Sequence, residues 1–188
     1  MFAENKLIPR AGRLLVAEPF MGDSFFRRSV VLLTEHSDKG SLGFILNKPL
    51  DVMVHEAVPD FPNHHHPALF GGPVSRDQLY YLHTLGDKIP GSLLVAPGIW
   101  WLGEFEEVKK MIAGKEIGIN EIRFFIGYAG WESGQLQKEM DDKSWFVARP
   151  DIDLIFSPNA ETMWAEAVRK MGDAYAPMAN FPEDPSLN

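Results

Sequence analysis

The feature that most constrains this chain is the spread of glycine and proline along it. Its 188 residues include 16 glycines and 14 prolines, scattered from Pro9 to Pro185. Glycine opens backbone conformations that suit turns, and proline removes an amide donor and ends regular elements. The sequence therefore predicts many short elements joined by turns, not a helical bundle. With 45% apolar residues, the chain can still bury a sizeable core.

Apolar, β-branched segments between these breaks have the composition of strands. The clearest pair is SVVLLTEH (29–36) and SLGFILNKP (41–49), which flank the turn signal SDKG and predict an antiparallel hairpin. Pro49 is expected to close the second strand, because proline cannot donate to a sheet ladder. Further strands are predicted at 12–17, 68–74, 78–85, 92–96, 98–103, 121–129 and 144–150, with a short extended piece at 153–156.

Three or four helices are expected around these strands. Residues 104–113 form an amphipathic pattern in which Glu106 and Lys110 are spaced for an i,i+4 ion pair. Gly114 suits the end of this helix. A shorter helix is predicted within residues 51–58.

Two further helices are predicted in the C-terminal part of the chain. Ser133 is expected to cap a short one. The last helix should have Ser157 as its cap, Pro158 at its first position and Gly172 just beyond its end. After Gly172 the residues read as an extended tail that lies on the surface or against a neighbouring subunit.

The order of these elements predicts the fold class. No internal repeat is visible, and the strands and helices do not alternate as in a parallel βαβ sheet. We therefore predict one α+β domain over residues 1–188, with a core at about 10–172 and the tail at 173–188. Its sheet should be bent and antiparallel or mixed.

Charge and cysteine content exclude several classes of function. There are 18 basic and 26 acidic side chains, for a net charge of -8, and this argues against direct binding of nucleic acid. The chain has no cysteine, so disulfides, thiol catalysis and thiolate metal sites are excluded. No apolar run has the length of a signal peptide core or a membrane span, so a soluble cytoplasmic protein is expected.

Histidines and serines were considered as metal ligands and catalytic groups. In the run His64–His65–His66, alternate side chains share a face, so His64 and His66 could converge, but an exposed polar loop explains the run better. Ser29 and His83 lie within predicted strands, where each is expected to be packed and hydrogen-bonded. We predict neither a metal site nor a cofactor.

The stretch FFIGYAGWESGQLQKEM (124–140) leads from a strand through three glycines and a tryptophan into a helix. A glycine-rich turn before a helix can bind phosphate through its amide groups. However, this loop has no lysine, and Glu132 would repel an anion. We therefore predict that Gly127 and Gly130 turn the chain sharply out of the strand, and that Trp131 packs on the core beside the bend.

Several of these segments together resemble the YqgE/AlgH family of bacterial proteins over about residues 10–172. The segments that carry the resemblance are GRLLVA (12–17), FRRSVV (26–31), GFILNKP (43–49), FGGPV (70–74), LH (82–83) and GYAGWESGQL (127–136), followed by Glu139 and Trp145. The resemblance implies an α+β fold whose sheet branches and curls into a pseudo-barrel, and a cytoplasmic location in a bacterium. It implies little about activity, although one branch of the family is labelled as a transcriptional regulator.

Polar residues within the matching segments are the candidate ligand-binding positions: Arg28, Ser29, His36, Asn47, His83, Gln135 and Glu139. Gln135 and Glu139 should share one helix face. Arg28 is equally compatible with a buried salt bridge to Glu139 and with ligand binding.

Three functional hypotheses follow. The leading one is a non-enzymatic protein that binds a small molecule or an unidentified protein partner. The second is an enzyme with a polar pocket near Arg28, His83 and Glu139. The third is indirect regulation of transcription through a protein partner, which predicts an exposed apolar patch near Trp100 or the tail.

Overall fold

The computed structural model of the chain describes residues 6–183. Its strands are β1 (Leu14–Ala17), β2 (Val30–Ser37), β3 (Gly40–Ile45), β4 (Pro49–Met53), β5 (Pro67–Phe70), β6 (Val74–His83), β7 (Leu93–Ala96), β8 (Ile99–Trp101), β9 (Ile122–Glu132) and β10 (Trp145–Ala148). Its helices are α1 (Val54–Ala57), α2 (Phe105–Ala113), α3 (Gln135–Asp141), α4 (Ile152–Ile155) and α5 (Ala160–Lys170), with 3-10 turns η1 (Gly86–Lys88) and η2 (Ala176–Asn180).

The ten strands form one branched sheet that does not close on itself. Its main path runs β10-β1-β2-β3-β9-β6-β8-β7, and β5 branches from β9 and carries β4. The pairs are antiparallel except β5 with β9. This confirms the predicted α+β class, the mostly antiparallel sheet and its branching.

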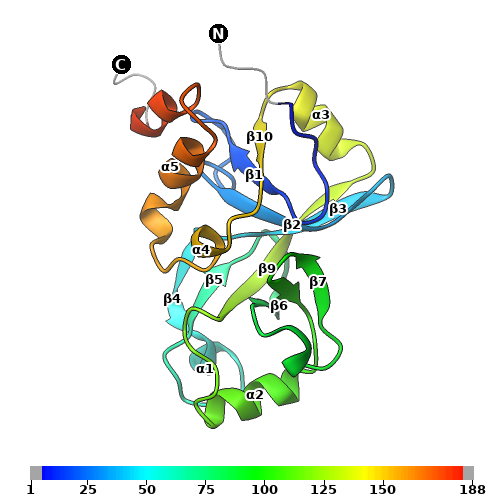
Figure 1. Cartoon of the computed structure of the whole chain (residues 1–188), viewed down its shortest axis with the longest axis vertical. Helices are drawn as coiled ribbons and strands as arrows, with labels where there is room; N and C mark the ends of the chain where they lie inside the picture. Colours follow the sequence, from blue (N-terminus) through cyan, green and yellow to red (C-terminus); the bar gives the residue numbers. More distant parts are fainter. Residues whose placement is uncertain (1–5, 184–188) are drawn as a thin grey trace.

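Two lobes share strand β9, as Figure 1 shows. The middle lobe (residues 49–126) contains β4 to β8, α1, α2 and the first half of β9. The terminal lobe (residues 6–46 and 129–183) contains the remaining strands and α3 to α5. The first half of β9 pairs with β5 and β6, whereas Ala129 to Glu132 pair with β3.

Glycines allow strand β9 to pass from one lobe to the other. Gly127 has φ 73°, and a Cβ atom on it would lie 2.4 Å from the carbonyl oxygen of Gly72. A Cβ atom on Gly71 would in turn lie 2.2 Å from the oxygen of Gly127. The backbone at Gly71 and Gly72 therefore packs directly against the backbone at Gly127, where any side chain would collide. Trp131 is buried, as predicted, but the prediction that the chain turns out of the strand at Gly127 and Gly130 is wrong, because β9 runs on to Glu132.

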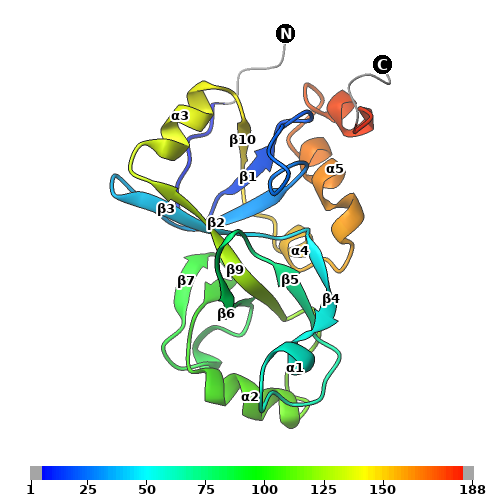
Figure 2. The same ribbon diagram turned by 180° about the vertical axis from the view of Figure 1, so that it is seen from behind.

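The terminal lobe buries both faces of its sheet. Alternate residues of β1 and β2 point to opposite faces, so Leu14 and Leu32 pack toward α4 and α5 while Leu15 and Val31 pack toward α3. Figures 1 and 2 show α3 and α5 on opposite sides of this sheet. The continuous apolar sequence of β2 is explained by this double burial.

The middle lobe has its own core. Helix α2 packs Val108, Met111 and Ile112 among apolar residues that include Phe124 of β9. Its ion pairs join Glu106 to Lys109 and Glu107 to Lys110, so the predicted pairing of Glu106 with Lys110 is wrong. The spacing of both real pairs is i,i+3.

Some local predictions fail at the ends of elements. Strand β3 ends at Ile45, and Pro49 begins β4 instead of closing the hairpin. Helix α1 is only one turn, because β4 takes up the first three residues, 51–53, of its predicted range. Gly134, not Ser133, precedes α3, in a left-handed conformation with φ 75°.

The segment after β10 is helical where an extended piece was predicted. Asp151 caps α4 by accepting a hydrogen bond from the Leu154 amide at 3.0 Å, and this local bond favours the helical turn. The last helix begins at Ala160 after Asn159, so Ser157 is not its cap. Gly172 does lie just past the end of α5, with φ 113°.

The predicted extended tail is also wrong for the part that the structure describes. Residues 176–180 form η2, and Tyr175 and Met178 are buried in the core cluster that includes α5. Residues 184–188 of the tail lie outside the described residues. Within residues 6–183, no helix combines the length and apolar character needed to cross a membrane.

Candidate functional site

Glu139 is a structural anchor for helix α3. Its Oε2 atom accepts hydrogen bonds from the indole Nε1 of Trp131 and of Trp145, both at 2.8 Å. Gln135 lies on the same helix face, as predicted, and donates to Oε1 of Glu139 at 3.0 Å. The carboxylate therefore fastens α3 to two buried tryptophans on β9 and β10.

Arg28 contacts the C-terminal segment and not Glu139. Its guanidinium lies 4.5 Å from the ring centroid of Trp164 and donates to the carbonyl oxygen of Phe181. Of the two roles considered for Arg28, the salt bridge to Glu139 is therefore not formed. Arg28 instead holds residues near η2 against α5.

Asn47 and Ser29 lie beside Arg28. The amide of Asn47 bridges the turn before β2, since it accepts from the Val30 amide at 2.9 Å and donates to the Arg28 carbonyl at 2.8 Å. Ser29 is fully buried, but its Oγ atom has no partner among the described residues. The expectation that this hydroxyl is hydrogen-bonded is therefore wrong.

His83 is buried and hydrogen-bonded on both ring nitrogens, as predicted. Its Nδ1 accepts from the Leu85 amide at 3.3 Å, so Nε2 carries the proton and faces Leu102 O at 3.2 Å and Ser92 Oγ at 3.1 Å. Burial lowers the pKa of His83. Because Ser92 donates to Ile89 O at 2.6 Å, this Ser–His contact is structural and lacks an activated nucleophile.

His36 lies at the exposed hairpin end, where its Nδ1 is 2.7 Å from Ser41 Oγ. It lines the same open surface groove as Gln135. The structure thus groups Arg28 with Ser29 and Asn47, and Gln135 with Glu139 and the groove near His36. Arg28, His83 and Glu139 have no common partner among residues 6–183, so the pocket of the enzyme hypothesis is not formed by these three side chains.

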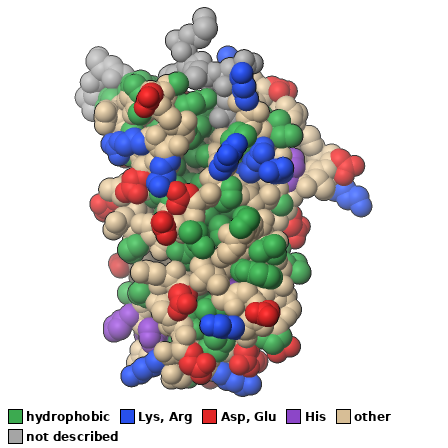
Figure 3. All heavy atoms as spheres, in the orientation of Figure 1, with side chains coloured by type: hydrophobic (Ala, Val, Ile, Leu, Met, Phe, Trp, Pro, Cys, Tyr) green, Lys and Arg blue, Asp and Glu red, His purple; other side chains and the backbone are tan. Residues whose placement is uncertain are grey.

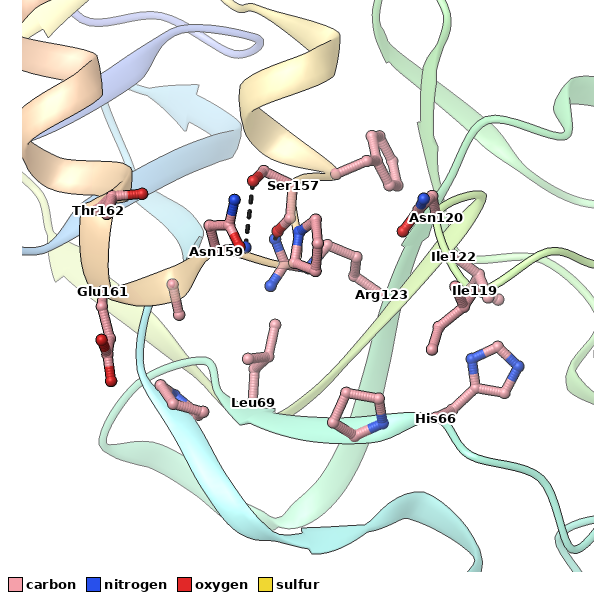
Figure 4. A pocket seen from close by; sticks show the side chains of 15 residues that line it. His66, Leu69, Ile119, Asn120, Ile122, Arg123, Ser157, Asn159, Glu161 and Thr162 are labelled. Carbon is pink, nitrogen blue, oxygen red and sulfur yellow. Dashed lines mark hydrogen bonds between the residues drawn. The ribbon is translucent and has the colours of Figure 1, made fainter.

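A different pocket lies between the two lobes, with a cavity volume of about 440 Å³ (Figure 4). That size is typical of small-molecule sites. We call it the inter-lobe pocket. The middle lobe contributes Pro49, His66, Pro67, Leu69, Ile119, Asn120, Ile122 and Arg123, and the terminal lobe contributes residues 156–162.

Arg123 reaches into this pocket from β9, toward Ser157 and Asn159 (Figure 4). One of its terminal nitrogens, Nη1, donates to the carbonyl oxygens of Ile155 and Ser157, both at 2.8 Å. Burial lowers its pKa to about 10, and no carboxylate among the described residues lies within 4.0 Å of it. A desolvated cation without a counter-charge is costly unless something else compensates it.

His66 forms another wall of the pocket. Only 1% of it is exposed, its ring stacks on His64 at 4.6 Å, and it meets Phe124 edge-on at 5.5 Å. Burial, and then the neighbouring His64, lower its pKa to about 4, so the imidazole is neutral near pH 7. The predicted shared face of His64 and His66 is confirmed, but an exposed loop is wrong for His66.

The start of α5 supplies polar backbone groups to the pocket. Asn159 precedes the helix without making a side-chain cap, and the residues from Asn159 to Thr162 line the cavity. The first amide groups of a helix have no partners within it and carry partial positive charge. This end of the pocket therefore favours a negative group.

The opening of α3, by contrast, makes its own contacts. The Glu132 amide donates to Oε1 of Gln135 at 3.0 Å, and Ser133 donates to the carbonyl oxygen of Asp38 at 2.6 Å. The loop is thus closed by its own side chains, which favours packing over phosphate binding there. No group of three or more potential metal ligands occurs in the part of the chain that the structure describes.

Sequence reasoning missed Arg123 and Ser92 as notable positions, and it assigned His66 to an exposed loop. Arg123 had a usable signal, since it is a lone charge in the otherwise apolar segment 122–126. Ser92 had no such signal, and the burial of His66 could not be predicted, because their surroundings come from segments distant in the chain.

Comparison with known proteins places this chain among close relatives. A family model described as AlgH-like matches residues 14–176. A UPF0301 protein of Chlorobaculum tepidum is 42% identical over 181 residues, which cover 96% of this chain and 97% of the relative. A UPF0301 protein of Bacteroides thetaiotaomicron is 39% identical over 185 residues, with 98% and 94% coverage.

Two solved structures share the fold. A crystal structure of a Corynebacterium diphtheriae protein superposes with a TM-score of 0.79 at 23% identity, covering 96% of this chain and 100% of that one. The solution structure of the AlgH protein of Pseudomonas aeruginosa has a TM-score of 0.73 at 27% identity, with 92% and 94% coverage.

Proposed function

The chain belongs to the AlgH-like family, and from the geometry of its inter-lobe pocket we propose that it binds a small anionic molecule without converting it. The observation that carries the proposal is Arg123, a half-buried guanidinium that lines the pocket and has no carboxylate partner among the described residues. Buried charges are normally paired, so an anion in the pocket would supply the missing partner.

The other polar groups of the pocket support binding over catalysis. The Ser157 hydroxyl accepts a hydrogen bond from the Asn159 amide at 3.2 Å, and Thr162 donates to Glu166 at 2.5 Å. The Thr162–Glu166 bond is an i,i+4 contact on the exposed surface of α5, no base among the described residues is hydrogen-bonded to Ser157, and His66 contacts rings, not a nucleophile. We therefore propose that this protein is a ligand binder; the absence of cysteine from its sequence supports a cytoplasmic location.

The proposal is tested by a thermal-shift screen against a library of small anions, neutral solutes and cations, followed by amide chemical-shift mapping of the hits. Because a ligand that binds only the folded state must stabilise it, anions should raise Tm. The perturbed amides should include Arg123 and residues 157–162. If all hits map elsewhere, or no anion shifts Tm, the pocket is not the functional site.

A second candidate function is docking of a protein partner, including a regulatory one. Leu93 and Leu94 on the edge strand β7 are 52% and 59% exposed, and the nearby Leu102 is 38% exposed. Figure 3 shows apolar side chains gathered over this part of the face. Replacing Leu94 by lysine should abolish capture of a partner from a lysate of the native host without lowering Tm. Recovery of the same proteins by both forms would argue against this surface.

A further inference from the structure

We infer that the ligand of the inter-lobe pocket is a monocarboxylate with a compact apolar body. This inference rests on the proposed function and specifies its chemical class. It follows from three features of the pocket: the free edge of one guanidinium, the count of charges around it and the apolar walls.

The guanidinium of Arg123 offers a planar pair of donors. Nη1 is occupied by two carbonyl oxygens, which fix the plane of the group. Nε and Nη2 have no hydrogen-bond partner among the described residues, and neither is a fully buried atom. Two parallel N–H groups of this kind match the two oxygens of a carboxylate.

The charges around the pocket favour a single negative charge. Arg123 is the one cationic side chain among the pocket residues, and His66 is a buried, neutral ring. Glu161 adds a negative charge at the edge of the cavity, away from the guanidinium (Figure 4). A phosphate dianion would leave one charge uncompensated, whereas a carboxylate is matched by Arg123 with help from the start of α5.

The remaining walls are largely apolar. Leu69, Ile122 and Phe156 line the cavity, and the side chains of all three are almost fully buried. The volume of about 440 Å³ limits the body of the ligand to a small branched or aromatic group. A ligand with a charged head and an apolar body would thus contact both kinds of surface.

Three matched probes test the carboxylate assignment: 4-methylpentanoate, 4-methylpentanamide and 3-methylbutyl phosphate. Binding is measured by titration with chemical-shift mapping at neutral pH. The carboxylate should bind about tenfold more tightly than the amide, because only it makes charge-assisted hydrogen bonds to the guanidinium. It should also bind more tightly than the phosphate.

Variants at Ile119 provide a control that leaves Arg123 untouched. Ile119 lines the pocket and is 51% exposed, so its replacement should not impair folding. Ile119→Asp should weaken carboxylate binding several-fold relative to Ile119→Asn, through repulsion across the pocket. The same pair of variants should bind the amide equally.

The outcomes separate the two proposals. The carboxylate assignment is wrong if the amide or phosphate binds in the pocket as tightly as the carboxylate. It is also wrong if the carboxylate binds the Ile119→Asp and Ile119→Asn variants with equal affinity. Ligand binding in the pocket would still stand in that case. If the carboxylate causes no shift in the pocket at millimolar concentration, the assignment is equally refuted, and the wider anion screen then decides the proposed function.

Discussion

Acid should destabilise this protein through His66. The ring is 1% exposed and lies between His64 and Phe124, and no acidic side chain among residues 6–183 forms an ion pair with it. Its pKa falls from 6.5 to about 4 on burial. Protonating it in the folded state would place a charge against two aromatic rings.

The sign of the effect follows from proton linkage. Between pH 6.5 and about pH 4, the unfolded chain binds a proton at His66 that the folded chain does not. The contribution to stability is therefore complete above pH 6.5 and is lost as pH falls toward 4. From these two pKa values, acidification from about pH 7.5 to about pH 5 should cost about 2 kcal/mol of unfolding free energy.

Urea denaturation at several pH values measures this term when the wild type is compared with His66→Phe. Phenylalanine retains an aromatic ring of similar shape but cannot titrate. The His66→Phe variant should therefore lose about 2 kcal/mol less unfolding free energy on acidification than the wild type does. His65→Phe is the matched control, because His65 is exposed and adjacent, and its pH dependence should equal that of the wild type. Equal pH dependence in His66→Phe and the wild type, or an NMR titration of His66 near pH 6.5, would refute the reasoning.

Two further predictions concern Glu139, which anchors α3, and Gly127, where β9 passes between the lobes. Glu139→Ala removes the shared acceptor of two buried indole N–H groups and should cost about 2–5 kcal/mol, seen as a Tm fall of roughly 5–15 °C, while Glu139→Gln keeps an acceptor and should cost less. A near-zero change in Glu139→Ala would contradict the anchoring role. Gly127→Ala should cost more than about 3 kcal/mol in urea denaturation, because it adds a backbone collision to left-handed strain. Gly134→Ala has similar strain at φ 75° but open space around it, so it should cost only about 1 kcal/mol; equal losses would argue against the collision.

Local patterns predicted much of the fold. The hairpin of β2 and β3 follows from β-branched runs around a turn, and α2 from its amphipathic spacing. These features depend on neighbours in the sequence, so they are visible without a structure. The glycines of the GYAG segment indicated an unusual backbone, although not that Gly127 packs against the glycines of the FGGP segment.

The candidate residues show where such prediction stops. The positions of Gln135 and Glu139 on one helix face could be predicted, but the indole partners of Glu139 could not, since Trp131 and Trp145 lie on different strands. A contact of Arg28 with Glu139 was one of two alternatives, yet its partner Phe181 is 153 residues away in the chain. Helix α4 is a single turn, too short to show a helical period.

By itself, the sequence determined the class of fold and most of the strands, because turn chemistry and hydrophobic period act over a few residues. Only the tertiary structure decided that His66 is buried, that Arg123 faces a cavity without a counter-charge and that the lobes enclose a pocket. Burial and electrostatic partnership depend on which distant segments meet. In this protein that meeting is set by one strand, β9, which passes through both lobes.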